Sequence, residues 1–230
     1  MIRTLIDRRE RPKPSVLPEE LRIAYGGDLW FPPSGSQRPF VIGNFVSTVD
    51  GVVSYEIAGK SGGGNISGFD ESDRFIMGLL RASADAVMVG SGTLRQTAPA
   101  HLFVAERVFP EARDLYARYR HEVLKKTAPP LQVVVSGGGK VDLRRAIFQT
   151  PGIRTLIVST QAGSGLLAAS GAGLLISTEV RTVDGPFLRR LTFSNFCTLS
   201  LAYRCFYMKA ALRCSASSWR TAASTNSSSP

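Results

Sequence analysis

The sequence lacks any apolar run of about 18 residues, so hydropathy predicts no membrane-spanning helix. The segment from Met1 to Lys13 is rich in charge and no apolar stretch follows it, which is not typical of a secretory signal. Only two histidines occur, His101 and His121, and neither belongs to a cluster with metal-ligand spacing. These absences predict a cytoplasmic protein with no metal site and no Ser-His-Asp hydrolase centre.

A formal net charge of +10 raises the hypothesis of nucleic-acid binding. The basic residues are scattered, and the sequence has neither an arginine-rich arm nor a stripe that combines aromatic and basic residues. We therefore predict no nucleic-acid partner. A basic enzyme that handles phosphorylated small molecules explains the charge equally well.

Residues 191–230 lack both acidic residues and glycine. All 18 acidic residues lie at or before Asp184, and all 22 glycines lie at or before Gly185. All three cysteines lie in this last segment, with spacings that match no zinc motif, and the segment is too apolar for an ordinary disordered tail. The composition predicts an N-terminal extension at 1–38, one α/β domain at 39–190 and an aberrant tail at 191–230.

Short buried strands alternate with helices along the predicted domain. Nearly continuous apolar runs predict strands, of which the last is weak, at 40–46, 84–90, 131–135, 155–158 and 174–176. Apolar periodicity and capping residues predict helices at 18–25, from Ser67 or Asp70 to about residue 80, at 110–125 and at 185–191. This alternation predicts an α/β fold with a mostly parallel sheet and helices on both faces.

The carboxyl ends of four predicted strands carry small and hydroxyl residues. These clusters are Ser47 and Thr48; Gly90, Ser91, Gly92 and Thr93; Ser136 with three glycines; and Ser159 and Thr160. Ligands bind beyond such strand ends, and free backbone N–H groups beside glycine suit phosphate oxygens. One cluster alone is more often a turn, but four together favour a phosphate-bearing cofactor or substrate. The cluster that begins at Gly90 has neither the full dinucleotide fingerprint nor the P-loop ending.

Asp50 is the one carboxylate at a predicted strand end beside a glycine. This position suits contact with a ligand. An Asp-Gly turn explains the same residue pair equally well. The spacing alone does not separate the two interpretations.

Three segments carry a resemblance to a known family. They are the strand with Asn44 that leads into Ser47-Thr48-Val49-Asp50-Gly51, the triplet Ile66-Ser67-Gly68, and the block from Leu80 to Thr93 with its Arg-Ala, Asp-Ala, Val-Gly and Gly-Thr pairs. They resemble the reductase domain of bacterial riboflavin-biosynthesis deaminase-reductases, which has a dihydrofolate-reductase-like fold. The resemblance covers about residues 39–190. Because this sequence has no counterpart of the zinc-binding deaminase half, the resemblance implies a stand-alone pyrimidine reductase.

The resemblance implies hydride transfer from NADPH to the ribosyl carbon of 5-amino-6-(5-phosphoribosylamino)uracil, in riboflavin biosynthesis. It implies that Asp50 is catalytic and contacts the substrate, as Asn44 and Ser47 do. It implies cofactor contacts along the strand ends: Gly90, Ser91, Gly92 and Thr93 at the phosphates, Ser159 and Thr160 at the adenosine-side phosphate, and Ser136 between them. The resemblance also implies a homodimer for an intact member of the family.

The tail departs from the family pattern, in which a Glu-Gly-Gly motif follows a final core strand and a Val-Asp-Glu-Leu segment comes later. Residues 191–230 contain neither motif. The resemblance therefore predicts that the last strands are lost or misformed, that an uncovered strand edge promotes aggregation, and that this chain has little reductase activity.

The genetic code suggests a cause, which is a one-base frameshift near residues 191–197. Reading the third base of each codon with the next two bases, Met208 followed by Lys209 must give glutamate, and the codons that follow can give Gly-Gly-Pro. Residues 218–228 can give Val-Ala-Asp-Gly-x-Val-Asp-Glu-Leu-x-Leu in the same way. The coding DNA tests this hypothesis, since we expect these motifs in the shifted frame. Synonymous codons that do not encode them would exclude it.

Two other functions stay open at this stage. The same fold can serve another substrate, such as a pterin or a different pyrimidine. Alternatively, the chain is a non-catalytic nucleotide-binding remnant. Substrate-dependent NADPH turnover over a small panel separates the two enzyme hypotheses, whereas NADPH binding without turnover indicates the remnant.

Overall fold

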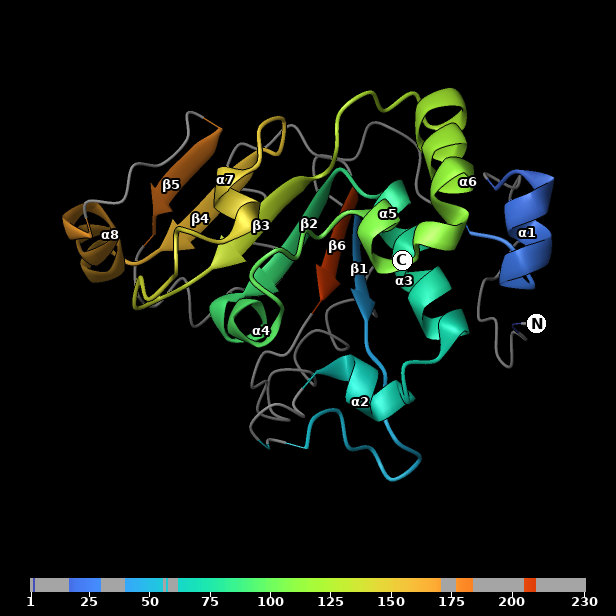
Figure 1. The fold of residues 1–230 in the computed structure, drawn as a ribbon, viewed down its shortest axis with the longest axis horizontal. Helices are drawn as coiled ribbons and strands as arrows, with labels where there is room; N and C mark the ends of the chain where they lie inside the picture. Colours follow the sequence, from blue (N-terminus) through green and yellow to red (C-terminus); the bar gives the residue numbers. More distant parts are fainter. Residues whose placement is uncertain are drawn as a thin grey trace, which may run out of the picture.

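A six-stranded parallel sheet organises the chain (Figure 1). The computed structural model describes residues 2, 17–29, 40–55, 57, 62–170 and 177–183, and the backbone of 205–209. The strands are β1 (Phe40–Asn44), β2 (Ala86–Gly90), β3 (Leu131–Val135), β4 (Thr155–Ser159), β5 (Thr178–Thr182) and β6 (Cys205–Lys209). Their order in space is β1-β6-β2-β3-β4-β5, and every neighbouring pair is parallel. The α/β fold with a mostly parallel sheet is thus confirmed.

Short helices connect the strands. The α-helices are α1 (Glu19–Tyr25), α2 (Gly63–Ser67), α3 (Glu71–Ser83), α4 (Ser91–Gln96), α5 (Ala105–Val108), α6 (Arg113–Arg118), α7 (Ala146–Gln149) and α8 (Gln161–Ala169). A 3₁₀ turn at Pro110–Ala112 precedes α6, and a π turn at Tyr119–Val123 follows it, so the predicted helix at 110–125 is formed in three parts. No helix in the described part of the chain is long and apolar enough to cross a bilayer.

The tail contributes a central strand, which differs from the prediction that the last strands are lost or misformed. Strand β6 lies between β1 and β2 and pairs with both, from Phe40 opposite Cys205 to Val89 opposite Lys209. The apolar and aromatic residues of this segment are suited to a strand, although they lie in a stretch with an aberrant composition. At this position the edge of β2 is therefore covered.

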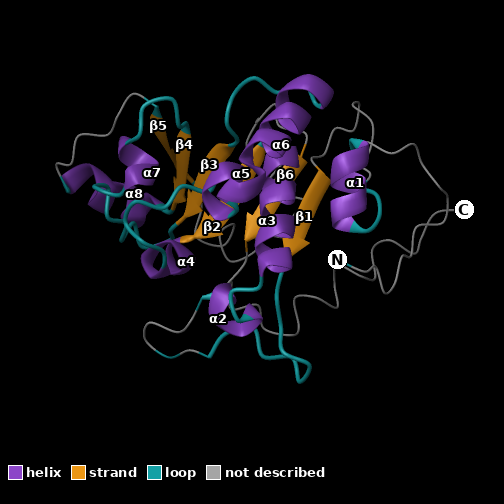
Figure 2. Ribbon diagram, turned by 45° about the vertical axis from the view of Figure 1, so that its right-hand side comes forward, coloured by secondary structure: helices purple, strands orange, loops and turns teal. Residues whose placement is uncertain are grey.

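The described helices that contact the sheet pack on one of its faces (Figure 2). The main buried cluster joins side chains from α3, α4, α7 and α8 to Val87, Val134 and Ile157 of the central strands. From β1 to β5 the chain always moves in the same direction along the sheet, and right-handed crossovers then fall on one face. The direction of movement along the sheet reverses between β5 and β6, so a right-handed connection there would cross the other face. Residues 184–204 of this connection lie outside the described part. Helices on the second face therefore stay a prediction, as does the helix at 185–191.

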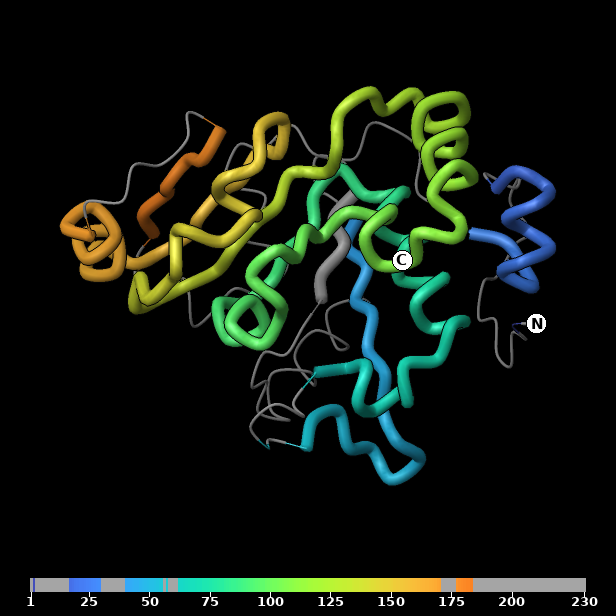
Figure 3. Tube along the Cα trace, in the orientation of Figure 1, coloured from blue at the N-terminus to red at the C-terminus, as the bar shows by residue number. Residues whose placement is uncertain are grey.

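The N-terminal helix packs into a second cluster with α3 and α6. In Figure 3 the dark blue trace of α1 runs beside the green trace of α6. Leu21 of α1 is fully buried against this cluster, and Glu20 pairs with Arg118 of α6 at 2.8 Å. Gly26 ends α1 with a φ of 69°, as the sequence predicts. Part of the predicted N-terminal extension therefore shares a hydrophobic cluster with the predicted domain.

A glycine inside α3 makes room for an aromatic side chain. A Cβ atom at Gly78 would lie 2.7 Å from the ring of Tyr116, whose hydroxyl donates to the carbonyl of Phe75 at 2.9 Å. Burial of the Tyr116 phenol raises its pKa above the ordinary value. The close contact explains why a helix of 13 residues tolerates glycine near its centre.

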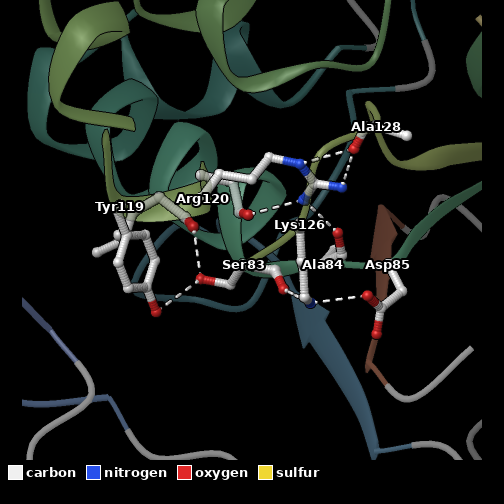
Figure 4. Close-up of polar contacts among 9 residues, drawn as sticks. Ser83, Ala84, Asp85, Tyr119, Arg120, Lys126 and Ala128 are labelled. Atoms are coloured by element: carbon white, nitrogen blue, oxygen red, sulfur yellow. Dashed lines mark hydrogen bonds and ion pairs between the residues drawn. The ribbon is translucent and has the colours of Figure 1, made fainter. Parts of the chain in front are cut away.

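A buried arginine fixes the junction between α3 and β2 (Figure 4). One terminal nitrogen of Arg120 donates to the carbonyls of Ala82 and Ala84 at 2.8 and 2.7 Å, and its Nε and other terminal nitrogen donate to the carbonyl of Ala128. A cation here satisfies carbonyls that a helix leaves open at its carboxyl end. Arg120 thus joins the end of α3 to the segment that leads into β3.

Lys126 adds a second cation at the same junction. Its Nζ lies 2.8 Å from Asp85 Oδ1 and 2.5 Å from the carbonyl oxygen of Ser83 (Figure 4). Both charged side chains are mostly buried. Asp85 belongs to the block that carries the family resemblance, and its contact here is a structural one at the amino end of β2.

Candidate functional site

All six strands end at one edge of the sheet because all are parallel. In Figure 1 the arrowheads of β1, β6 and β2 point toward the edge where α2 and α4 lie. Ligands of open parallel sheets bind beyond this edge, near the place where the strand order reverses. Here the reversal brings β6 between β1 and β2, so the ends of these three strands define the centre of the candidate site.

A tight turn beyond β1 carries Asp50. The Thr48 N–H donates to the Val52 carbonyl at 2.9 Å, and the Thr48 hydroxyl accepts from the Val52 N–H at 2.9 Å. Gly51 takes a φ of 89°, which requires glycine, and its N–H donates to the Thr48 carbonyl. The Asp50 carboxylate is exposed and accepts a hydrogen bond from the Thr48 hydroxyl. Asp50 is therefore both a turn residue and a carboxylate open to a ligand.

The other substrate residues that the resemblance implies lie close to this turn in the chain. Asn44 is the last residue of β1, is half-buried and is paired in register with Lys209 of β6. Ser47 is exposed on the segment that leads to the turn. All three predicted substrate residues thus lie at the carboxyl end of β1 or shortly after it.

The predicted cofactor residues at Gly90–Thr93 form the junction between β2 and α4. A Cβ atom at Gly90 would meet no described residue within 4 Å, so the described part of the chain leaves the space in front of this backbone open. Thr93 is buried, and its Oγ1 has no hydrogen-bond partner among the described residues. A buried hydroxyl without a partner beside open backbone suits a polar ligand.

The predicted residues at β3 and β4 use their hydroxyl groups within the fold. Ser159 donates to the carbonyl of Ser136 at 2.6 Å and is fully buried. Thr160 donates to the carbonyl of Gly137 at 2.7 Å and accepts from the N–H of Gly163, so it is the N-cap of α8. Their contact with a phosphate stays a prediction, and such a phosphate would have to be met by other groups at this end of the sheet.

Two glycines allow the loop after β3 to touch the start of α8. Gly139 takes a φ of 65°, and a Cβ atom there would collide with the Gly163 carbonyl. A Cβ atom at Gly163 would lie 2.5 Å from the Gly137 oxygen and 2.7 Å from the Gly139 nitrogen. In contrast, the backbone at Gly138 is open. At least part of the glycine-rich loop is therefore required for backbone packing.

A buried arginine beside this site has no sequence signal that would identify it. Arg145, at the start of α7, donates to the carbonyl and the hydroxyl of Thr97 at 2.5 and 3.0 Å and to the carbonyl of Ala98 at 3.0 Å. Thr97 ends α4. In the sequence, Arg145 lies in a polar stretch that is typical of a surface turn.

The described residues contain no group of three or more His, Cys, Asp or Glu side chains that could hold a metal ion. The site as described combines an exposed carboxylate, open backbone at glycine and hydroxyl groups. Such an arrangement suits a polar organic ligand with phosphate groups.

Several solved structures are similar to this chain, and they include the following two. A pyrimidine reductase-like protein from Corynebacterium diphtheriae is 16% identical and superposes with a TM-score of 0.51, over 89% of this chain and 75% of that one. A diaminohydroxyphosphoribosylaminopyrimidine deaminase/5-amino-6-(5-phosphoribosylamino)uracil reductase from Thermotoga maritima is 18% identical over 76% of this chain, with a TM-score of 0.45. The present chain spans 40% of that protein's length. A comparison with functionally curated proteins gives no significant match.

The sequence also matches a family model over residues 39–166, from the residue before β1 into α8. The matched range contains β1 to β4 and all the predicted site residues, and it is more than half of the chain. The family that this model describes is the RibD C-terminal domain. The chain therefore belongs to the RibD C-terminal domain family.

Proposed function

We propose that this protein is an NADPH-dependent reductase that acts on 5-amino-6-(5-phosphoribosylamino)uracil in riboflavin biosynthesis. The observation that carries the proposal is the junction of β2 and α4, where, among the described residues, the backbone at Gly90 is open and the buried hydroxyl of Thr93 has no partner. Membership of the RibD C-terminal domain family supports the same reaction class. When bound, the nicotinamide supplies the hydride.

The residues of the β2–α4 junction fit the phosphates of such a cofactor. Gly90 and Gly92 leave the backbone accessible, since among the described residues a Cβ atom at Gly90 has no neighbour within 4 Å and one at Gly92 meets an Arg95 side-chain nitrogen at 3.9 Å. The Thr93 hydroxyl offers a hydrogen bond that nothing in the described chain takes. These groups would hold the diphosphate and thereby orient the cofactor across the carboxyl edge.

Asp50 would act at the other side of the site. Its carboxylate is held by the Thr48 hydroxyl on a turn that Gly51 fixes, so its orientation is set before a substrate binds. A carboxylate in this position can hold a polar group of the sugar or accept a proton from it. Asn44 and Ser47 would contact the substrate beside it.

Single-turnover reduction is the direct test of this function. Excess protein is mixed with the phosphoribosylaminouracil and NADPH, and the loss of NADPH absorbance is followed with the ribityl product as a second readout. A pterin and an unrelated pyrimidine serve as comparison substrates. Consumption of NADPH only with the proposed substrate supports the proposal. If neither this chain nor a product with the restored reading frame consumes NADPH, the proposal is wrong.

The variant Asp50→Asn tests the proposed role of the carboxylate. We expect its single-turnover rate to fall by about 10²–10³, because positioned acid–base groups contribute factors of that size. Its NADPH affinity should stay within about twofold, since Asp50 is not among the residues proposed to hold the phosphates. The matched control is Asp114→Asn, an exposed aspartate of α6 that should change neither quantity. An unchanged rate in Asp50→Asn would show that the residue only shapes the turn.

A further inference from the structure

We propose that Arg145 is a positioning residue, which fixes α4 so that Gly90–Thr93 at its other end keep the geometry for the cofactor diphosphate. The inference rests on the proposed function for the identity of the ligand. It assigns a role to a side chain that follows β3 by ten residues in the chain and reaches the end of a helix that follows β2.

The contacts place the guanidinium at the carboxyl end of α4. One terminal nitrogen of Arg145 donates to three oxygens, namely the carbonyl and hydroxyl of Thr97 and the carbonyl of Ala98. Thr97 in turn closes the helix, because its N–H and its hydroxyl both donate to the Leu94 carbonyl, at 3.2 and 2.8 Å. One arginine therefore holds the residue that caps the last turn of α4.

A second contact ties the same loop to α7. The N–H of Ala146 donates to the carbonyl of Pro99 at 3.0 Å, directly after Arg145 in the chain. The loop after α4 is thus held at Thr97, Ala98 and Pro99 by two adjacent residues. The side chains of Ala98 and Pro99 are exposed, so burial of these side chains adds little to the support of the loop.

The length of α4 explains why such support matters. A helix of six residues is not stable alone, so its position depends on what holds it. Only Thr93 and Leu94 of α4 are buried. A cation at the carboxyl end interacts favourably with the open carbonyls, and Arg145 is only 9% exposed, so solvent screens it weakly.

The neighbouring arginine provides a matched control. The Arg144 side chain is 89% exposed and pairs with Asp142 Oδ1 at 2.9 Å. This hydrogen bond lowers the pKa of Asp142 and raises that of Arg144. Exposed pairs of this kind contribute little to stability, and the hydrogen bonds of Arg144 among the described residues go to Asp142 and not to the loop after α4.

The experiment compares Arg145→Gln, Arg145→Lys and Arg144→Gln in the full chain. It measures amide hydrogen exchange at residues 91–96, the Kd for NADPH by fluorescence titration, and the exchange of β2, β3 and β4 as a report on the whole fold. For Arg145→Gln we expect exchange in α4 to rise about tenfold and NADPH binding to weaken about tenfold, with the strands unchanged. Arg145→Lys should restore part of both, whereas Arg144→Gln should match the wild-type chain.

Each outcome decides the proposal. Wild-type exchange in α4 of Arg145→Gln overturns it, and so does a rise that is equal in α4 and in the strands, which would indicate a general structural role. If Arg145→Gln does not fold, Arg145→Lys carries the test, since several-fold faster exchange in α4 supports the proposal and wild-type exchange refutes it. Absence of NADPH binding by the wild-type chain would instead count against the proposed function, and exchange in α4 would still decide the role of Arg145.

Discussion

Replacing Gly163 by alanine is expected to destabilise the folded chain by about 3 kcal/mol and to weaken NADPH binding at least about tenfold. The added Cβ would lie 2.5 Å from the Gly137 oxygen and 2.7 Å from the Gly139 nitrogen, and it would also collide with the Ser159 hydroxyl. Two of these three obstacles are backbone atoms, so no change of side-chain rotamer removes them. The loop after β3 must move away from α8, and the predicted cofactor residues at Ser136 and Ser159 move with it.

Gly165→Ala is the matched control because it lies two residues further along the same helix. A Cβ atom at Gly165 would meet nothing within 4 Å. Alanine there should stabilise the protein by about 0.5–1 kcal/mol, since it restricts the unfolded chain without a clash. Urea unfolding gives both free energies, and NADPH titration gives the affinities. Equal stability of the two variants would contradict the close contact between the loop and α8.

The sequence predicted the strands that are buried on both faces, but it did not predict the bounds of a polar strand at the edge of the sheet. The run at 131–135 predicts β3 with its observed bounds, because a proline and a serine enclose five residues that include four aliphatic ones. The weak strand predicted at 174–176 lies outside the described residues, and β5, at 178–182, was not predicted. That strand is at the edge of the sheet and carries Glu179 and Arg181, which pair at 2.6 Å, so its apolar signal is small.

Strand order could not be read at all, since it depends on contacts between distant segments. The alternation of strands and helices is the same whether the chain moves along the sheet in one direction or reverses. Only the structure shows that β6 lies between β1 and β2, and therefore that β1 to β5 are connected over one face. The prediction of helices on both faces rested on the common pattern of such sheets.

The sequence predicted where the candidate site lies, but it did not predict which hydrogen bonds each side chain of the site forms. Ser159 and Thr160 follow β4, as expected for residues near a ligand, but serine and threonine are also the residues that cap helices. Thr160 forms its hydrogen bond with Gly137, which lies 23 residues earlier, and no local pattern indicates such a partner. Arg145 was missed for the same reason, because its three acceptors lie 47 and 48 residues away.

Restoring the reading frame between codons 191 and 197 is expected to raise NADPH-dependent reductase activity by at least about 100-fold, or about 2.7 kcal/mol in the barrier. Strand β6 ends at Lys209, which is in register with Asn44 at the carboxyl edge. In the restored frame the junction of the Met208 and Lys209 codons gives glutamate, followed by Gly-Gly, at the end of this central strand. Two glycines there would let a diphosphate approach the backbone, whereas the present sequence has alanine at positions 210 and 211.

The control for this gain is the restored protein with its recovered glutamate replaced by lysine. If activity depends on the motif, this change alone should remove most of the gain while thermal unfolding stays that of the restored protein. If the gain comes only from better folding of the C-terminus, the lysine variant keeps it. A present chain that oxidises NADPH as fast as the restored one would refute the prediction of low activity. In that case β6, which already fills the gap between β1 and β2, is the part of the tail that the site needs.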